Sequence, residues 1–203
     1  MRSRFLHFSL FALILLCSTN SLAATDLESA KRAYHDKDYA TAVQEFSSMA
    51  DKGNPEAQLI LGKMYMMGQG VPKDPEQANK WLKASAAQGN ADAEFFLGAM
   101  YLLPKKDIAE GVKWLRLSAE QGMQDAQYLL GKAYLTGDKE LPRDPVQGDM
   151  WLRLAAKDNK QFYQDELNGA EREMNADQIS KAKEMAAVWK PKSEVNSTPE
   201  QSK

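Results

Sequence analysis

Few side chains in this sequence form a pattern that could support catalysis or metal binding. Downstream of the first segment, His35 is the one histidine, and it lies among Asp36, Lys37 and Asp38 with no cysteine after Cys17. A single imidazole without thiolates cannot supply the ligands of an ordinary zinc site. A serine hydrolase relay would need His35 and a Gly-x-Ser-x-Gly turn, which the sequence lacks. We therefore expect no catalytic, metal-binding or cofactor-binding residues, and a solvated loop histidine at position 35.

Carboxylates recur at one position along the chain, where a structural role explains them. Glu56, Asp92 and Asp125 each precede an alanine that opens a predicted helix, and a negative charge there is favoured by the positive end of the helix dipole. The stretch Gly68-Gln-Gly70 follows a predicted helix and lacks the lysine and the serine or threonine of a phosphate-binding loop. We interpret the acids as helix-capping residues and the glycines as a turn.

The first 23 residues have the composition of a cleavable signal peptide. Arg2 and Arg4 precede a nearly apolar stretch over residues 5–17, and Ser21-Leu22-Ala23 provides a cleavage site. The apolar stretch is shorter than the roughly 20 residues that span a bilayer. We therefore expect cleavage after Ala23 or Ala24, and no stable membrane insertion of the cleaved chain.

Cys17 raises the alternative of a lipoprotein signal, but Leu16 stands where such signals carry a small residue. Cleavage as predicted would remove the only cysteine, and with it any disulfide or thiolate site. It would also remove Arg2 and Arg4 but no acidic residue, so that the formal net charge would go from -2 to -4. Because no basic excess is available to neutralise phosphates, we expect no nucleic-acid partner.

Three copies of a two-part motif follow one another along the chain. The first part reads Ala-x-x-x-Leu-Gly-x-x-Tyr, and the second begins with Trp-Leu. The two parts start at Ala57 and Trp81, at Ala93 and Trp114, and at Ala126 and Trp151. Alanine, leucine and tyrosine at i, i+4 and i+8 share one helix face, while glycine at i+5 lets a neighbouring helix approach. The spacing predicts an all-α fold of stacked helix hairpins, with the three tryptophans packed in the core rather than stacked on a ligand.

The motifs resemble the Sel-1-like repeat family, which is related to TPR repeats. The resemblance rests on the three copies together with Gly-x-Gly-Val-x-x-Asp at residues 68–74 and Ala-x-x-Trp at residues 78–81. The second copy departs from the pattern by replacing the glycine turn with residues 103–107, and the third inserts residues 138–141. The resemblance covers roughly residues 26–160. It implies a right-handed α-solenoid of antiparallel helix hairpins that acts as an adaptor for other proteins.

The repeats divide the chain into seven predicted segments. They are a signal peptide (1–23), an N-terminal capping hairpin (24–56), repeats at 57–92, 93–125 and 126–160, C-terminal capping helices (161–189) and a disordered tail (190–203). Within the C-terminal cap, Asn175 and Gln178 have the spacing of a capping box, which predicts a helix over residues 176–189. A second helix is predicted over residues 162–173.

The first helix of each repeat usually lines the concave face of stacked hairpins. The side chains there that the motif does not use combine apolar and aromatic groups with two lysines, which suits an extended or helical peptide. The predicted partner-binding residues are Leu59, Lys63, Met66, Met67, Phe95, Leu102, Tyr128, Lys132 and Leu135. The alternative is that the C-terminal capping helices cover this face.

The leading prediction is a non-enzymatic adaptor of the bacterial cell envelope, periplasmic or secreted, that binds a protein or peptide. One alternative is a secreted protein that binds or hydrolyses β-lactams, as the resemblance to Cys-rich relatives suggests, although this chain lacks their paired cysteines. Another is a component of an assembly associated with peptidoglycan. Variable surface positions set partner specificity in repeat proteins, so the motif residues do not name the partner.

Overall fold

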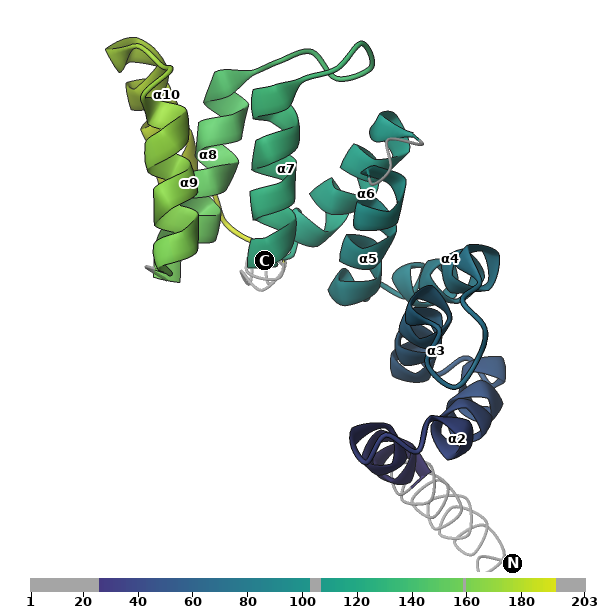
Figure 1. Cartoon of the computed structure of the whole chain (residues 1–203). Helices are drawn as coiled ribbons and strands as arrows, with labels where there is room; N and C mark the ends of the chain where they lie inside the picture. Colours follow the sequence, from purple (N-terminus) through teal and green to yellow (C-terminus); the bar gives the residue numbers. More distant parts are fainter. Residues whose placement is uncertain (1–25, 103–106, 159, 193–203) are drawn as a thin grey trace, which may run out of the picture. The chain divides into compact units, whose positions relative to one another are not determined.

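The computed structural model describes residues 26–102, 107–158 and 160–192 (Figure 1). These residues form helices joined by short turns, and no strand occurs among them. The predicted signal peptide with Cys17, the turn at 103–106 and the tail from residue 193 lie outside the described residues. Within the described ranges, no helix has both the length and the apolar character needed to cross a bilayer. The chain divides into one unit that ends at Ser85 and a second that begins at Ala86.

The first unit contains a helix at residues 26–35, α2 (Tyr39–Asp51), α3 (Pro55–Met67) and α4 (Pro75–Ala86). Its core includes the fully buried side chains of Phe46, Leu61 and Met64. Helix α3 begins at Pro55, two residues before the predicted opening at Ala57, because the Asn54 side chain caps it by accepting a hydrogen bond from the Ala57 amide at 2.9 Å. It ends at Gly68, whose φ of 75° is a left-handed conformation that favours glycine.

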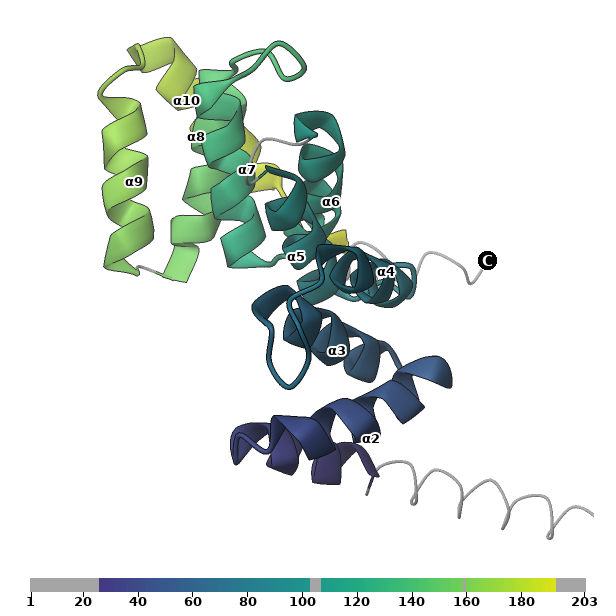
Figure 2. The ribbon, with the colours of Figure 1, turned by 45° about the vertical axis from the view of Figure 1, so that its right-hand side comes forward.

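The described part of the second unit contains six α-helices and a short 3-10 turn at residues 156–158, and Figures 1 and 2 show their arrangement. Its core brings together Leu115, Leu130 and Trp151, with a second cluster around Leu152 and Leu167. The helices are α5 (Ala91–Leu102), α6 (Ile108–Glu120), α7 (Gln124–Thr136), α8 (Pro145–Ala155), α9 (Gln161–Glu171) and α10 (Ala176–Val188). The described chain is therefore all-helical and built of helical repeats, as predicted.

Each motif glycine sits where the two helices of its hairpin meet. A Cβ atom added at Gly62 would lie 2.8 Å from Leu82 Cγ, and one added at Gly98 would lie 2.6 Å from Leu115 Cγ. At Gly131, the added atom would lie 2.9 Å from the Gly148 carbonyl oxygen. These distances are shorter than real Cβ contacts, so the predicted reason for glycine at this position is confirmed three times.

Polar side chains repeat with the motif and connect one hairpin to the next. The Gln58 amide donates to the Ala50 carbonyl at 3.1 Å, and the Gln127 amide donates to the Ala119 carbonyl at 3.2 Å. In each case the glutamine lies eight residues after the carbonyl, on the first helix of the next hairpin. Each carbonyl also accepts from a backbone amide, that of Gly53 or Gly122, at 3.0 Å. The buried glutamine is therefore a second donor, and it links the first helix of one hairpin to the end of the preceding hairpin.

The turn between the two helices of a repeat is closed in the same way in the first and third copies. The Asp74 amide donates to the Tyr65 carbonyl at 3.0 Å, and the Asp144 amide donates to the Tyr134 carbonyl at 2.9 Å. The third-copy loop is one residue longer, and its extra length is taken up where the Leu141 amide donates to the Asp138 carbonyl at 3.2 Å. The insertion changes the loop and leaves α7 and α8 in register.

The motif tryptophans differ in their degree of burial. Trp151 is 3% exposed and packs edge-on against Trp189, with ring centroids 6.1 Å apart. Trp81 and Trp114 are half-buried, and the Trp114 indole nitrogen donates to Glu110 at 2.7 Å. The prediction of core packing is confirmed for Trp151, whereas the other two rings lie at the edge of the core.

The C-terminal helices begin and end close to the predicted positions. The capping box at α10 is present, since the Asn175 side chain accepts from the Gln178 amide at 2.9 Å and the Gln178 side chain accepts from the Asn175 amide at 3.0 Å. The acids Glu56, Asp92 and Asp125 lie in the first turns of α3, α5 and α7, where the helix dipole favours them. Their predicted capping role is wrong, because Asn54 and Asn90 accept the capping hydrogen bonds of α3 and α5, and Met123 stands at the N-cap of α7.

Candidate functional site

The predicted binding residues of the first repeat lie on α3 and differ in exposure. Leu59 is buried at 9% exposure, Lys63 and Met66 are half-buried, and Met67 is 50% exposed. Leu59 is therefore a core residue in this unit. The exposed apolar surface on α3 is concentrated at Met67, at the C-terminal end of the helix.

The two predicted residues of α5 take part in packing. Phe95 is half-buried against the core of the second unit and meets Phe96 edge-on, with ring centroids 5.3 Å apart. Leu102 lies against α6, because a Cβ atom added at Gly111 would be 3.0 Å from Leu102 Cγ. Both side chains therefore take part in packing, and Leu102 also lines a cavity.

The three predicted residues of α7 lie beside α9. The Tyr128 ring meets the rings of Phe162 and Tyr163, with centroids 5.1 and 5.7 Å away. Lys132 Nζ lies 2.6 Å from the Glu166 carboxylate, and this hydrogen bond raises the pKa of Lys132 above its ordinary value. Leu135 packs against the cluster that contains Leu152 and Leu167. For α7, the contacts favour the alternative in which the C-terminal helices cover this face.

Tyr163 holds the N-terminal end of α9 on the preceding repeat. It is 5% exposed and donates a short hydrogen bond to Asp125, in the first turn of α7. Burial, followed by this hydrogen bond, raises the pKa of Tyr163 to about 12. No motif in the sequence predicts this contact between Tyr163 and Asp125. The spacing of Phe162, Tyr163, Glu166 and Leu167 along one helix face was the available signal.

A small apolar cavity remains open between α5 and α7. Its volume is about 220 Å³, and Leu102, Ile108, Leu129 and Ala133 form most of its wall. The polar side chains at its edge are those of Lys132, Thr136 and Asp138. Two of the predicted residues, Leu102 and Lys132, are thus brought together. The positions at 129, 133 and 136 follow i, i+4 and i+7 spacing, which could have identified them as a second face of α7.

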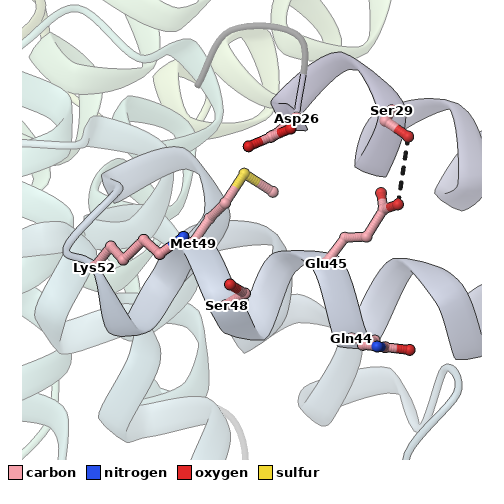
Figure 3. A pocket seen from close by; sticks show the side chains of 7 residues that line it. All are labelled: Asp26, Ser29, Gln44, Glu45, Ser48, Met49 and Lys52. Carbon is pink, nitrogen blue, oxygen red and sulfur yellow. Dashed lines mark hydrogen bonds between the residues drawn. The ribbon is translucent and has the colours of Figure 1, made fainter. Parts of the chain in front are cut away.

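The N-terminal hairpin carries a second, more polar pocket of about 230 Å³ between residues 26–35 and α2 (Figure 3). Ser29 Oγ donates to Glu45 Oε1 at 3.3 Å, while Glu45 Oε2 is buried without a hydrogen-bond partner among the described residues. Asp26, Gln44 and Ser48 add further polar groups. Because this lining offers little apolar surface, the cavity between α5 and α7 is the stronger candidate for a protein contact.

The described residues contain little that could perform chemistry. No group of three or more His, Cys, Asp or Glu side chains comes together among them in a way that could hold a metal ion. His35 is exposed at the end of the first helix. Glu94 is the buried carboxylate of α5, 5% exposed, and burial raises its pKa above the ordinary range.

Comparison with known proteins gives the same picture of the repeats. A model of the Sel1 repeat matches residues 55–90, 91–123 and 124–160, which together make up more than half of the chain. No curated protein is significantly similar in sequence.

Two solved structures are similar in fold and sequence. A protective antigen of uropathogenic Escherichia coli that displays an SLR fold is 30% identical, with a TM-score of 0.65, over 72% of this chain and 32% of that chain. A Sel1 repeat protein from Oxalobacter formigenes is 31% identical, with a TM-score of 0.61, over 66% of this chain and 56% of that chain. The present chain thus spans about a third of the first protein and little more than half of the second.

Proposed function

This chain belongs to the Sel1 repeat family, whose proteins generally serve as scaffolds for protein interactions, and we propose that it is a non-catalytic adaptor of the bacterial cell envelope. The partner contact is the cavity between α5 and α7, lined by Leu102, Ile108, Leu129 and Ala133. This open apolar cavity on the first helices of two successive repeats is the observation that carries the proposal.

The size of the cavity indicates which kind of group can fill it. Its volume of about 220 Å³ lies below the roughly 300–1,000 Å³ of small-molecule pockets, and it suits one bulky side chain. Burying a leucine or phenylalanine side chain there would contribute about 1.5–3 kcal/mol. We therefore assign as occupant a partner segment that inserts a single aliphatic or aromatic side chain, in the manner of an interface hot spot.

The charges around the cavity favour an apolar anchor over a charged one. Lys132 already pairs with Glu166 at 2.6 Å, so its ammonium does not require a carboxylate from the partner. Thr136 is exposed at the end of α7, and Asp138 stands beside it in the following loop. These groups form a polar rim that can hydrogen-bond the backbone of the partner segment while its side chain fills the cavity.

The envelope location rests on the first residues of the chain. Arg2, Arg4 and the apolar stretch over residues 5–17 have the composition of an export signal. If the signal is cleaved after Ala23 or Ala24, the chain isolated from cells begins at Ala24 or Thr25. N-terminal sequencing of that chain tests this directly, and an intact N-terminus on a chain in the cytoplasm would contradict export.

Site-specific photocrosslinking in cells tests the partner contact. A benzoylphenylalanine at Thr136 should give a crosslinked protein that is lost when Ala133→Leu fills the cavity, since Ala133 is half-buried in its wall. The crosslinked segment of the partner should contain a bulky apolar residue, and its replacement by alanine should weaken binding in the purified pair.

The matched control places the same crosslinker at Ala40, an exposed position of α2 that does not line the cavity. Ala40→Leu serves as the control for the cavity-filling variant. The same adducts from positions 40 and 136, or an adduct at 136 that persists in a folded Ala133→Leu chain, would contradict the cavity as the contact. Turnover of a chromogenic β-lactam by the purified chain would contradict the non-catalytic role.

A further inference from the structure

A larger cavity lies in the C-terminal part of the second unit, among α8, α9 and α10. Its volume is about 570 Å³, within the roughly 300–1,000 Å³ typical of ligand-binding sites and larger than the cavity between α5 and α7. Positively charged and apolar side chains share its wall: Arg153, Lys157, Lys183, Leu154, Leu167 and Trp189. This space exceeds what one side chain fills.

The charge in this cavity is positive, although the whole chain is acidic. Arg153 is balanced, because it pairs with the fully buried Asp149 on its own helix and with Glu171 on α9. Lys157 and Lys183 make no ion pair within the described residues. Two exposed lysines thus border the cavity, although Lys183 also feels the charge of the buried Asp149, and Arg153 lies between two carboxylates.

The apolar part of the wall is fixed by the core behind it. Leu154 and Leu167 are 8% and 7% exposed and belong to the two core clusters of the second unit. The half-buried Trp189 ring stands edge-on to the buried Trp151 ring at 6.1 Å. A tryptophan held by packing presents contact area with little loss of conformational entropy, which is why such residues are frequent at binding sites.

The last two described residues leave the wall of this cavity. Pro191 lies on its wall, but the next residue, Lys192, pairs with Glu120 of α6 at 2.5 Å. The last described residue is thus paired with another helix. The positive and apolar lining of the cavity indicates an occupant that is both acidic and apolar.

We propose that this cavity binds a segment of a partner protein that carries neighbouring carboxylate and bulky apolar side chains. Lys157 and Lys183 pair with the carboxylates, while Trp189 and Leu154 cover the apolar group. This inference rests on the interaction role proposed above but uses a different set of residues, so one contact can fail while the other holds.

The test uses the whole chain without its first 23 residues and a defined probe, the peptide acetyl-Glu-Asp-Leu-Phe-Glu-Asp-amide. Nitrogen-15 correlation spectra resolve the indole N–H signals of the four tryptophans. The signal that disappears in Trp189→Phe is that of Trp189, at the cavity. The peptide should shift the Trp189 indole signal in a saturable way and leave those of Trp81 and Trp114 in place. Lys157→Glu with Lys183→Glu should weaken binding by about tenfold or more, as the loss of two rim ion pairs predicts.

The matched control is Lys181→Glu, a charge reversal at an exposed position of the same helix that does not border the cavity. It should bind the peptide like the native chain, and so should Ala133→Leu, which separates this site from the cavity between α5 and α7. Circular dichroism confirms that each variant is folded.

Four results would overturn the proposal. One is the absence of a Trp189 shift at millimolar peptide, and another is equal binding of a peptide in which lysines replace the acids. A third is binding of sodium acetate at the same concentration as the peptide, which would mark a site for simple anions. Sedimentation with phosphatidylglycerol vesicles that depends on Lys157 and Lys183, without peptide binding, would assign the surface to lipid instead.

Discussion

The Gln164 side chain donates a hydrogen bond to the Ala156 carbonyl at 2.8 Å, across the same eight-residue interval that separates Gln58 from Ala50 and Gln127 from Ala119. This relationship identifies α9 as the first helix of a fourth, degenerate repeat. Asn168 then takes the position that Gly131 has in the third repeat. This position thus lacks the glycine of a close helix contact, and Trp189, which follows α10, packs on Trp151 of α8.

The first prediction concerns this hydrogen bond. Gln164→Ala should lower the free energy of unfolding by about 1 kcal/mol, because it leaves the Ala156 carbonyl without its donor. Urea denaturation measures the change. Gln161→Ala, on the same helix but at an exposed position, should change stability by no more than about 0.5 kcal/mol. Equal effects of the two substitutions would show that the repeated link contributes nothing specific.

The second prediction concerns the motif glycines. Gly98→Ala should destabilise the chain by about 1–2 kcal/mol, since the new methyl would lie 2.6 Å from Leu115 Cγ and force the helices apart. The same substitution at Gly169 of α9, which has nothing within 4 Å, should instead stabilise it by about 0.5–1 kcal/mol through helix propensity. Thermal unfolding followed by circular dichroism gives both signs, and two stabilising results would contradict the close-approach role.

The third prediction concerns Glu94, which stands where the other repeats have glutamine. Burial raises the pKa of Glu94 in the folded chain. Protonated Glu94 therefore favours the folded state, and this contribution to stability is lost as the pH rises from the unfolded-state pKa through the folded-state pKa. Glu94→Gln should therefore stabilise the chain at pH 7, by on the order of 1 kcal/mol, through an amide that can donate to the Ala86 carbonyl.

The pH dependence of the stability difference distinguishes the removal of a buried charge from a gain in packing. The stability difference between Glu94→Gln and the native chain should narrow as the pH is lowered below the folded pKa, because native Glu94 is then neutral as well. Urea denaturation at pH 7 and pH 4 measures the two differences. A difference that stays constant between these pH values would rule out the buried charge as its origin.

The fourth prediction concerns the buried ion pair between Asp149 and Arg153. Asp149→Ala should cost about 3 kcal/mol, because Asp149 is fully buried and its loss leaves Arg153 with Glu171 alone. Replacing both residues, by leucine and methionine, should recover most of that stability. Lys113→Ala removes an exposed pair with Glu110 and should cost less than about 0.5 kcal/mol. Differential scanning calorimetry of the three variants tests this order of destabilisation.

The sequence predicted the repeat architecture because the motif residues report directly on local packing. Glycine at 62, 98 and 131 identified the close helix contacts, and Asn175 with Gln178 identified the start of α10. These features depend on neighbours within one or two turns, or on a contact that recurs in every copy. Their spacing therefore carries the information needed to place them.

The candidate binding residues were harder to predict because their partners belong to the degenerate end of the array. Tyr128 and Lys132 pack against Phe162 and Glu166, some 34 residues away, and no repeated pattern links these positions. Lys157 and Lys183 face a common cavity only because α10 packs on α8. A motif repeated along the chain cannot encode contacts that occur once.

The loop between α7 and α8 has a practical consequence. Two hydrogen bonds hold this loop: the Leu141 amide donates to the Asp138 carbonyl, and the Asp144 amide donates to the Tyr134 carbonyl. Lys139 and Glu140 are exposed between Asp138 and Leu141. A chain that accommodates extra length at this point can also accommodate an inserted reporter, such as a fluorophore-binding tetracysteine tag. Because Asp138 borders the cavity between α5 and α7, a dye at that position would sense when the cavity is filled.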